Sequence, residues 1–485
     1  MSLPTCPGMT PTSVALANAR AHFSRSKVRN MKLAAVFVLL LASVAADYTL
    51  PSSVNCAGTT YTPASGLCCS NYGYPGNSSA YCGVGSCAGG SCGLTGCHLT
   101  GCPTGQCCSQ YGYCGASAGY CDPANRCFSK CWAAAPSCSP VYVAYFANYK
   151  SQYGANGGCG FIPEMILPTQ KYTHINWAFA SFDGSTGIIA DLSAYDANMV
   201  SRLIALKANN TALKIIVSLG GGGFGSAPWT NLMGSASAQN AFFSGLKAWI
   251  LKYKFDGIDI DWEFPTSGQT ALVATFFQKA RAAIGNDLLL TAATGNKYYN
   301  QFYAPENWIQ YVNFLNVMNY DYYYGNGGVT GSDAPLYGQQ NSGSINATIN
   351  DYFNRDVPAH KLVFGLRNYG YIFAVNSNTP TTGMAFSGLS TYKTQCAGAG
   401  SLSAIDVTTL LTNSTKSATQ FSVQWDDSTK SAFATWPNNY ATFETTASIK
   451  AKVDYIKDYG LGGAMLWILD SDSTIADYIG KQLNW

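Results

Sequence analysis

The sequence has 485 residues, of which 47% are hydrophobic and 11% are charged, and its formal net charge is +3. At roughly 100 to 200 residues per domain this length allows two to four domains, while 28 basic against 25 acidic side chains exclude the strongly basic surface of a nucleic-acid-binding protein. Aromatic residues at 13%, with 32 Tyr, and 49 Gly instead suit a neutral ligand that has both hydroxyls and apolar faces, such as a sugar.

The first 46 residues carry a targeting signal. Basic residues up to Lys32 precede an apolar run at 33–41, and small residues follow at 42–46. This is the pattern of a secretory signal peptide. We therefore expect an upstream extension at 1–30, a signal peptide at 31–46 and a secreted, extracellular protein without a membrane partner after cleavage. A signal anchor is the alternative, which the short apolar run disfavours because a bilayer needs about 20 residues.

Cysteine is concentrated in one region, since fourteen of the 18 cysteines lie between Cys56 and Cys131. The region is rich in turn residues and has almost no aliphatic periodicity from which to build a core. Such a composition indicates a disulfide scaffold that forms in an oxidising compartment.

Residues 97–131 contain eight of these cysteines. Their spacing closely resembles that of the hevein-like chitin-binding modules, and the resemblance implies the disulfides Cys97–Cys108, Cys102–Cys114, Cys107–Cys121 and Cys127–Cys131. It also implies a sugar site made of Ser109, Tyr111, Tyr113 and Tyr120. Flat aromatic rings can stack on the apolar face of a pyranose, so these residue types fit the implied ligand.

Residues 55–92 align to the same module but carry six cysteines. The two missing positions hold Pro63 and Pro75, and because these positions are partners in the family, one whole disulfide is absent. The resemblance implies disulfides among the remaining Cys56, Cys69, Cys68, Cys82, Cys87 and Cys92, and a sugar site made of Ser70, Tyr72, Tyr74 and Tyr81. For both modules the alternative is a Tyr-rich structural knot that binds nothing.

The pattern changes after a linker at 132–140. Short apolar runs then alternate with helical segments, which is typical of βα units and a parallel sheet. The predicted strands are 141–147, 173–182, 213–220, 255–263, 288–295, 312–321, 361–370 and 462–470. Eight such runs predict an α/β fold, a (β/α)8 TIM barrel over 141–485. Because 94 residues separate Arg367 from Gly462, we also predict an insertion subdomain at 371–442.

The segment DGIDIDWE, 256–263, concentrates acidic residues on one predicted strand. Side chains alternate between the two faces of a strand, so Asp259, Asp261 and Glu263 share one face and point into the barrel, near the mouth where barrel enzymes react. Like charges this close retain at least one proton near neutral pH, and a general acid needs such a proton. A buried acidic ladder without function is the alternative, which its desolvation cost disfavours.

The same residues carry a second resemblance. DxxDxDxE is the signature of the family 18 glycoside hydrolases, the chitinases, and three further motifs agree in order: SLGG at 218–221, MNYD at 318–321 and GGAMLW at 462–467. The resemblance implies that Glu263 protonates the scissile oxygen while the substrate's own acetamido carbonyl attacks C1, so that no protein nucleophile is needed. The ligands it implies are chitin and N-acetylglucosamine oligomers, acted on by a monomer without a cofactor or metal.

The family's site residues carry over to matching positions here. The implied catalytic residues are Glu263, Asp261, Asp259, Tyr320 and Asp321, and the implied substrate-binding residues are Trp467, Met318, Tyr145, Phe179 and Gly221. In the resemblance Asp261 orients the acetamido group, which Tyr320 hydrogen-bonds, and Trp467 forms the floor beneath the sugar. The long span before Gly462 resembles the α+β insertion of chitinases that have deep clefts.

This chain departs from the family at two places around the cleft. Gly222 follows SLGG where many relatives have Trp, and the segment GLRNYGY has Arg367 for Pro and Tyr371 for Arg. These departures leave the subsite preference open. Two other functions stay open as alternatives, an inactive chitin-binding lectin and an endo-N-acetylglucosaminidase. The pairing of Cys138, Cys159 and Cys396 is also open, with Cys138–Cys159 as one possibility.

Overall fold

The computed structural model describes residues 140–152, 159–167, 171–322, 328–338, 343–416 and 421–483, together with the backbone of six short strands in the Cys-rich region. The upstream extension at 1–30, the signal peptide at 31–46 and all but the last residue of the linker at 132–140 lie outside these described residues. The side chains of the predicted sugar sites and module disulfides lie outside them as well, so all of these stay predictions.

Each predicted module contains one small sheet. In the first, β1 (Cys68–Ser70), β2 (Pro75–Gly76) and β3 (Cys87–Gly90) have the order β2-β1-β3, and in the second, β4 (Cys107–Ser109), β5 (Cys114–Gly115) and β6 (Cys127–Ser129) have the order β5-β4-β6. The register shifts at the same place in both, where Ser70 faces Cys87 and Ser109 faces Cys127. The two segments therefore share one local backbone pattern.

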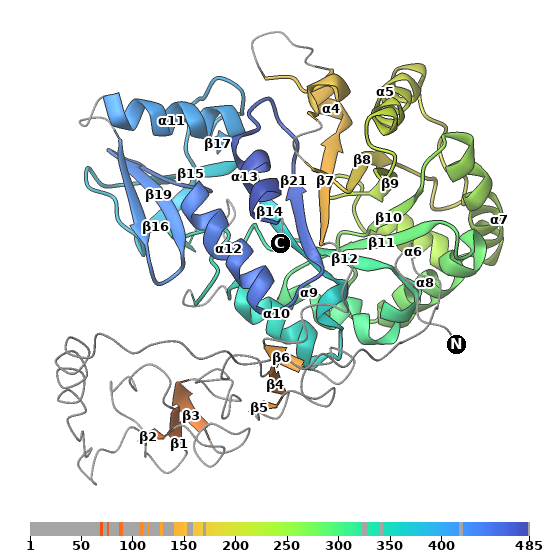
Figure 1. Ribbon diagram of the computed structural model, residues 1–485, viewed down its shortest axis with the longest axis horizontal. Coiled ribbons are helices and arrows are strands. Elements are labelled where there is room, and N and C mark those ends of the chain that lie inside the picture. Colours follow the sequence, from red (N-terminus) through yellow and green to blue (C-terminus); the bar gives the residue numbers. More distant parts are fainter. Residues whose placement is uncertain are drawn as a thin grey trace, which may run out of the picture. The chain divides into compact units, whose positions relative to one another are not determined.

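A closed barrel of eight parallel strands follows (Figure 1). Its strands are β7 (Val141–Ala147), β8 (His174–Ala180), β9 (Lys214–Gly220), β10 (Gly257–Asp261), β11 (Leu289–Thr294), β12 (Phe314–Val317), β14 (Leu362–Arg367) and β21 (Gly463–Trp467). All eight predicted strands are confirmed. The barrel closes in the order β10-β11-β12-β14-β21-β7-β8-β9, so the loops that follow the eight strands gather at one mouth.

Helices surround the barrel. They are α4 (Asn148–Ser151), α5 (Ala194–Ala205), α6 (Ala227–Gly234), α7 (Ala236–Lys252), α8 (Thr270–Ile284), α9 (Lys297–Tyr303), α10 (Ile345–Asn354), α12 (Thr446–Asp458) and α13 (Thr474–Gln482). Several begin at a side chain that caps the first turn, for example Ser235, whose hydroxyl accepts a hydrogen bond from the backbone N–H of Ala238. Directly after β10, Trp262 stacks on Trp229 of α6 with ring centroids 5.4 Å apart.

A second, antiparallel sheet has most of its strands between β14 and β21 in the chain. It has the order β13-β16-β15-β20-β19-β18, with β17 paired to β15. Its strands are β13 (Gly328–Val329), β15 (Gly370–Val375), β16 (Ala385–Leu389), β17 (Ser401–Leu402), β18 (Ser422–Asp426), β19 (Ser431–Trp436) and β20 (Asn439–Phe443). One buried cluster joins α11 (Ala404–Lys416) to this sheet: it contains Val407 and Leu410 of α11, Leu402 of β17 and Ile372 of β15. Figure 1 shows α11 in blue beside these strands.

A disulfide joins Cys159 to Cys396, with their Cα atoms 5.1 Å apart. The possibility that Cys159 pairs with Cys138 is therefore wrong. The sequence could not decide between them because the two bonded residues are 237 positions apart. Within the described ranges, no helix is both long and apolar enough to cross a membrane.

Candidate active site

The carboxylate of Asp259 lies fully buried inside the barrel and accepts four hydrogen bonds. Tyr145 and Ser218 donate to its Oδ2 at 2.7 and 2.8 Å, and Thr291 and Asn316 donate to its Oδ1 at 2.6 and 3.1 Å. Burial raises the pKa of Asp259, and these hydrogen bonds oppose that rise because each of them favours the ionised form. The four donors thus come from four other strands of the barrel, β7, β9, β11 and β12.

Two residues further along the same face, Asp261 interacts with Glu263. Burial raises the pKa of Asp261 well above its ordinary value, and the charges of Glu263 and Asp259 raise it further. Burial, followed by the charge of Asp321, raises the pKa of Glu263 to about 7, while hydrogen bonds from Asp261 and from the backbone of Gly222 oppose the rise. The pair therefore retains a proton near neutral pH, as expected from the spacing of the acids.

The glycine run after β9 brings the backbone close to these acids. A Cβ on Gly222 would lie 3.4 Å from Oε1 of Glu263, so the absent side chain leaves room beside the carboxylate. Gly221 has φ +88° and packs against Phe179, whose ring atoms would lie 2.8 Å from a Cβ at this position. Gly222 is the residue that departs from the family pattern, and it borders the carboxylate of Glu263 directly.

Aromatic side chains cluster on Trp467 at the end of β21. The ring of Trp467 is stacked with Phe179 at 5.7 Å and meets Tyr145 edge-on at 5.4 Å between centroids. The hydroxyl of Tyr320 lies 3.8 Å from Sδ of Met465 on the same strand. Trp467 is only partly buried, so one part of its ring is left open at the barrel mouth.

Asp321 is exposed at the mouth and is held by two tyrosines. Tyr369 and Tyr371 donate hydrogen bonds to its Oδ1 at 2.7 and 3.0 Å. Tyr371 is the residue that replaces the family's Arg, so a neutral hydroxyl donor contacts Asp321 where the family pattern has a cation.

Arg367, the other departure from the family, does not face the cleft. Its side chain is fully buried, forms an ion pair with Asp333 and lies 3.5 Å from Glu444, which also pairs with the buried Lys452. It donates further hydrogen bonds to the carbonyl and hydroxyl of Thr442 at 3.3 and 3.1 Å. The expectation that this departure borders the substrate is therefore wrong, because the guanidinium turns into the seam between β14 and the second sheet.

A cleft of about 610 Å³ extends over the loops that follow β7, β14 and β21. It contains Asp321, Tyr369, Tyr371 and Trp467, and at its other side Tyr149, Lys150, Cys159, Gln395 and Cys396. Its volume lies within the range of roughly 300 to 1,000 Å³ that is usual for pockets of drug-sized ligands.

A second aromatic group flanks Glu263 at the ends of β10 and β11. The ring of Phe264 stacks on that of Tyr299 at 3.8 Å, and Tyr299 meets Tyr298 edge-on at 5.1 Å. Both rings of the stack lie over Gly295, where a Cβ would come within 2.8 Å of Tyr299 and 3.1 Å of Phe264. Tyr298 is 64% exposed, so the group presents an open aromatic ring next to Tyr299.

The structure brings most of the predicted site residues to one place. Met318, half-buried, directly follows β12, and its backbone N–H donates to Thr294 at 2.8 Å. The residues that sequence reasoning missed are Ser218, Thr291, Asn316, Tyr369, Phe264, Tyr298 and Tyr299. Two of them could have been found from the strand register, because Asp259 pairs with Ser218 on β9 and with Thr291 on β11.

Among the described residues, no group of three or more His, Cys, Asp or Glu side chains is arranged to hold a metal ion. The arrangement offers instead a shared carboxylic proton at Asp261 and Glu263, an open indole face at Trp467 and hydroxyl donors around Asp321. Such a site can protonate a leaving oxygen and hold a neutral, hydroxyl-rich ring against an aromatic floor.

Comparison with known proteins gives one matching family. The family described as "Glycosyl hydrolases family 18" matches residues 141–472. Chitotriosidase-1 of Mus musculus is 29% identical over 357 residues, which are 68% of this chain and 73% of the mouse protein.

Two solved structures share the fold. The group IV chitinase of Ostrinia furnacalis in complex with allosamidin superposes with a TM-score of 0.65 at 24% identity, covering 71% of this chain and 98% of that chain. Human YKL-39, described as a pseudo-chitinase with retained chitooligosaccharide-binding properties, gives 0.64 at 21% identity and covers 71% of this chain and 100% of its own.

Proposed function

The chain belongs to glycosyl hydrolases family 18, and from this premise we propose that it is a chitinase that hydrolyses β-1,4 bonds between N-acetylglucosamine units by substrate-assisted retaining catalysis. The observation that carries the proposal is the Asp261–Glu263 pair. Burial and the charge of Asp321 raise the pKa of Glu263 to about 7, and burial raises the pKa of the neighbouring Asp261 as well, so a proton is available at the position of a general acid.

In the proposed first step, Glu263 gives its proton to the glycosidic oxygen. The C1–O bond breaks as the acetamido carbonyl oxygen of the same sugar bonds to C1, which yields a cationic oxazolinium ion and a neutral alcohol. Water then adds to C1 and returns a proton to Glu263, so the configuration at C1 is retained. The protein supplies no nucleophile, which is the substrate-assisted exception to the two-carboxylate scheme.

Three acids and one tyrosine stabilise the charge in this proposal. Asp261 orients the acetamido group and stabilises the positive oxazolinium ion, while the phenol of Tyr320 hydrogen-bonds the acetamido oxygen. Asp259 controls the proton on Asp261, since its own oxygens are filled by donors and its charge raises the neighbouring pKa. Asp321 binds the distorted sugar over Trp467.

The aromatic groups around Trp467 and around Phe264 suggest how a sugar chain lies across the barrel mouth. Trp467 on β21 and Glu263 after β10 belong to strands that stand opposite each other in the closed order. A sugar over Trp467 therefore presents its C1 side to Glu263, and the leaving part of the chain extends toward Phe264, Tyr299 and Tyr298. The glycone part extends the other way, into the 610 Å³ cleft.

We propose further that the protein is secreted and reaches insoluble chitin through its N-terminal modules at 55–92 and 97–131. The signal pattern at 31–46 and the two Cys-rich repeats support this targeting. Two weak modules in tandem raise the local concentration on a polymer without any new contact.

Sugar release from colloidal chitin tests the proposal. The wild-type protein should release soluble N-acetylglucosamine oligomers, and Glu263→Gln should release none, because an amide cannot give a proton to the leaving oxygen. Absence of hydrolysis by the wild-type protein would overturn the enzyme function.

An inactive chitin-binding lectin is the second candidate, because human YKL-39 shares the fold and is described as a pseudo-chitinase that retains oligosaccharide binding. The presence of Glu263 in its perturbed environment favours the enzyme. A panel of chitin hexamer and N-glycan substrates separates chitinase from endo-N-acetylglucosaminidase activity, since the two share the chemistry.

A further inference from the structure

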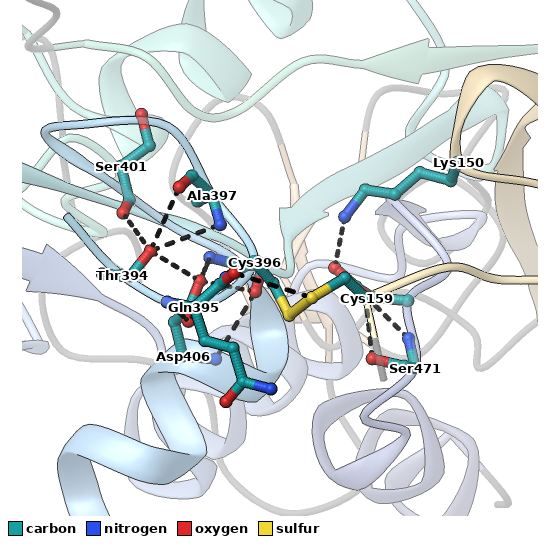
Figure 2. The surroundings of a disulfide bond; sticks show 11 residues. Lys150, Cys159, Thr394, Gln395, Cys396, Ala397, Ser401, Asp406 and Ser471 are labelled. Atoms are coloured by element: carbon teal, nitrogen blue, oxygen red, sulfur yellow. Dashed lines mark hydrogen bonds and ion pairs between the residues drawn. A yellow bond between two sulfur atoms is a disulfide. The ribbon is translucent and has the colours of Figure 1, made fainter. Parts of the chain in front are cut away.

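The Cys159–Cys396 disulfide lines the same cleft as Asp321 and Trp467. Cys159 lies in the loop that follows β7 and α4, and Cys396 lies in the loop between β16 and β17 of the second sheet. Figure 2 shows the two segments meeting at the sulfur atoms. The bridge thus ties the second sheet's loop to the barrel at the edge of the cleft.

A buried acid, Asp406, binds several groups of the loop on the Cys396 side. Asp406 of α11 accepts hydrogen bonds from the hydroxyl of Thr394 at 2.9 Å and from the backbone N–H groups of Gln395 and Cys396 at 3.0 and 3.2 Å (Figure 2). It also accepts from the backbone N–H of Ser403 at 3.0 Å. These hydrogen bonds tie residues 394–403 to α11.

The segment on the Cys159 side is held by the barrel. Phe161 is buried, packs on Phe146 at 6.1 Å between ring centroids and donates its backbone N–H to Lys150 at 3.3 Å. Lys150 in turn pairs with Asp470, after β21, at 2.7 Å. Each half of the bridge thus has contacts in its own surroundings, and the disulfide is the covalent link between them at the edge of the cleft.

The bridge lies away from the proton donor. The cleft is built on the loops after β7, β14 and β21, whereas Glu263 follows β10, which stands opposite β21 in the closed barrel. Under the proposed function, the bond that breaks lies beside Glu263. Sugar units in this cleft are then the glycone part of the chain, and the disulfide lies beyond the unit on Trp467.

We propose that the Cys159–Cys396 bridge is a specificity-determining element: it holds the loop at 394–397 as the end wall of the glycone cleft and so sets how many N-acetylglucosamine units bind beyond Trp467. Gln395 of this wall has an amide that suits acetamido groups, and the exposed ring of Tyr149 on α4, which lines the same cleft, suits a pyranose face. The inference rests on the proposed function, because it assigns the glycone direction from the role of Glu263.

The test compares wild type with the double variant Cys159→Ser/Cys396→Ser on a long and a short substrate. With the N-acetylglucosamine hexamer we expect KM to rise roughly fivefold, as for the loss of one or two hydrogen bonds to sugar, and the ratio of dimer to trimer products to change. With a chromogenic N-acetylglucosamine disaccharide, which leaves the far end of the cleft empty, kcat/KM should change by less than about twofold.

Two controls separate the wall from a general loss of stability. Val200→Ala removes buried side-chain atoms in α5, outside the cleft, and should lower the melting temperature without altering the product ratio. Gln395→Ala and Tyr149→Ala keep the bridge and should each raise KM for the hexamer alone. An unchanged hexamer KM and product ratio in the double variant, or equal losses on both substrates, would overturn the proposal.

The outcome is separable from a failure of the proposed function. If wild type does not hydrolyse chitin, calorimetric binding of the hexamer and the disaccharide still compares the two proteins. Weaker binding of the hexamer alone by the double variant supports the wall, and equal binding by both proteins refutes it.

Discussion

The guanidinium of Arg367 lies over the ring of Tyr369, with its central carbon 5.7 Å from the ring centroid. The same phenol donates a hydrogen bond to Asp321 at 2.7 Å. A fully buried cation thus stands directly behind a residue of the cleft, and its guanidinium also donates to the backbone carbonyl of Tyr369 at 3.2 Å. Arg367 thus connects the buried ion pairs with Asp333 and Glu444 to the tyrosine that binds Asp321 in the cleft.

Removal of this cation should destabilise the protein. Arg367→Met leaves Asp333 buried without its ion-pair partner, and a broken buried pair costs about 3 to 5 kcal/mol. We expect a clearly lower midpoint in chemical denaturation. Lys450→Met, which breaks an exposed pair with Asp454, is the control and should change the free energy of unfolding by less than about 1 kcal/mol. Equal midpoints for the two variants would contradict the network.

The rate of hydrolysis should fall on the alkaline side near pH 7. Glu263 has its pKa raised from its ordinary value to about 7, so it is protonated below this pH and loses the catalytic proton above it. A measured profile of kcat/KM against pH should therefore show a descending alkaline limb with its midpoint near pH 7. Asp321→Asn removes a negative charge that raises the pKa of Glu263, so the limb should move to lower pH even though the overall rate falls. A shift to higher pH would contradict the electrostatic assignment.

Asp259→Asn should lower kcat far more than it changes KM. An amide places a donor where a carboxylate oxygen now accepts hydrogen bonds from Thr291 and Asn316 or from Tyr145 and Ser218. It also removes the charge that raises the pKa of Asp261. We expect kcat to fall by roughly 10²- to 10³-fold, the scale of losing an electrostatic group in a dry site.

Thr291→Val is the matched control for this substitution. It removes one of the four donors to Asp259 and leaves the charge in place, so the fall in kcat should be roughly tenfold or less, as for one hydrogen bond. Steady-state kinetics on a soluble oligomer measures both variants. Similar losses in the two would show that the charge of Asp259 has no special role.

The glycines after β9 should differ sharply in their tolerance of alanine. Gly221→Ala forces a Cβ to within 2.8 Å of the Phe179 ring at a φ of +88°, so it should cost about 1 to 3 kcal/mol and displace the ring that stacks on Trp467. At Gly223 nothing lies within 4 Å of a built Cβ, and Gly223→Ala should stay within about 0.5 kcal/mol of wild type. Thermal unfolding and Trp fluorescence distinguish them, and equal behaviour would refute the close packing.

The barrel and the acids could be predicted from the sequence because both depend on local periodicity. Alternation along 256–263 places Asp259 and Asp261 on one face and Trp262 on the other, and the contacts of Trp262 with α6 bear this out. Each predicted strand ends within four residues of the observed one.

What could not be predicted depends on contacts between distant segments. Cys159 and Cys396 are 237 residues apart, and no local pattern decides which cysteine of three meets which. The direction of Arg367 depends on Asp333 and Glu444, which come from two other segments and meet it only in the seam. The hydrogen bonds from Tyr369 and Tyr371 to Asp321 could not be predicted either, because the positions of these rings follow from the bend between β14 and β15.

The hydrogen bonds of Asp259 have a consequence for how this barrel could lose activity in evolution. Its donors come from β7, β9, β11 and β12, so with β10 a single carboxylate cross-links five of the eight strands. A descendant that discards Asp259 must find new partners for four buried polar groups at once. A descendant that discards Glu263, which is only half-buried, disturbs little beyond its own surroundings. Selection for sugar binding alone would therefore erase the proton donor first and keep Asp259 as part of the architecture.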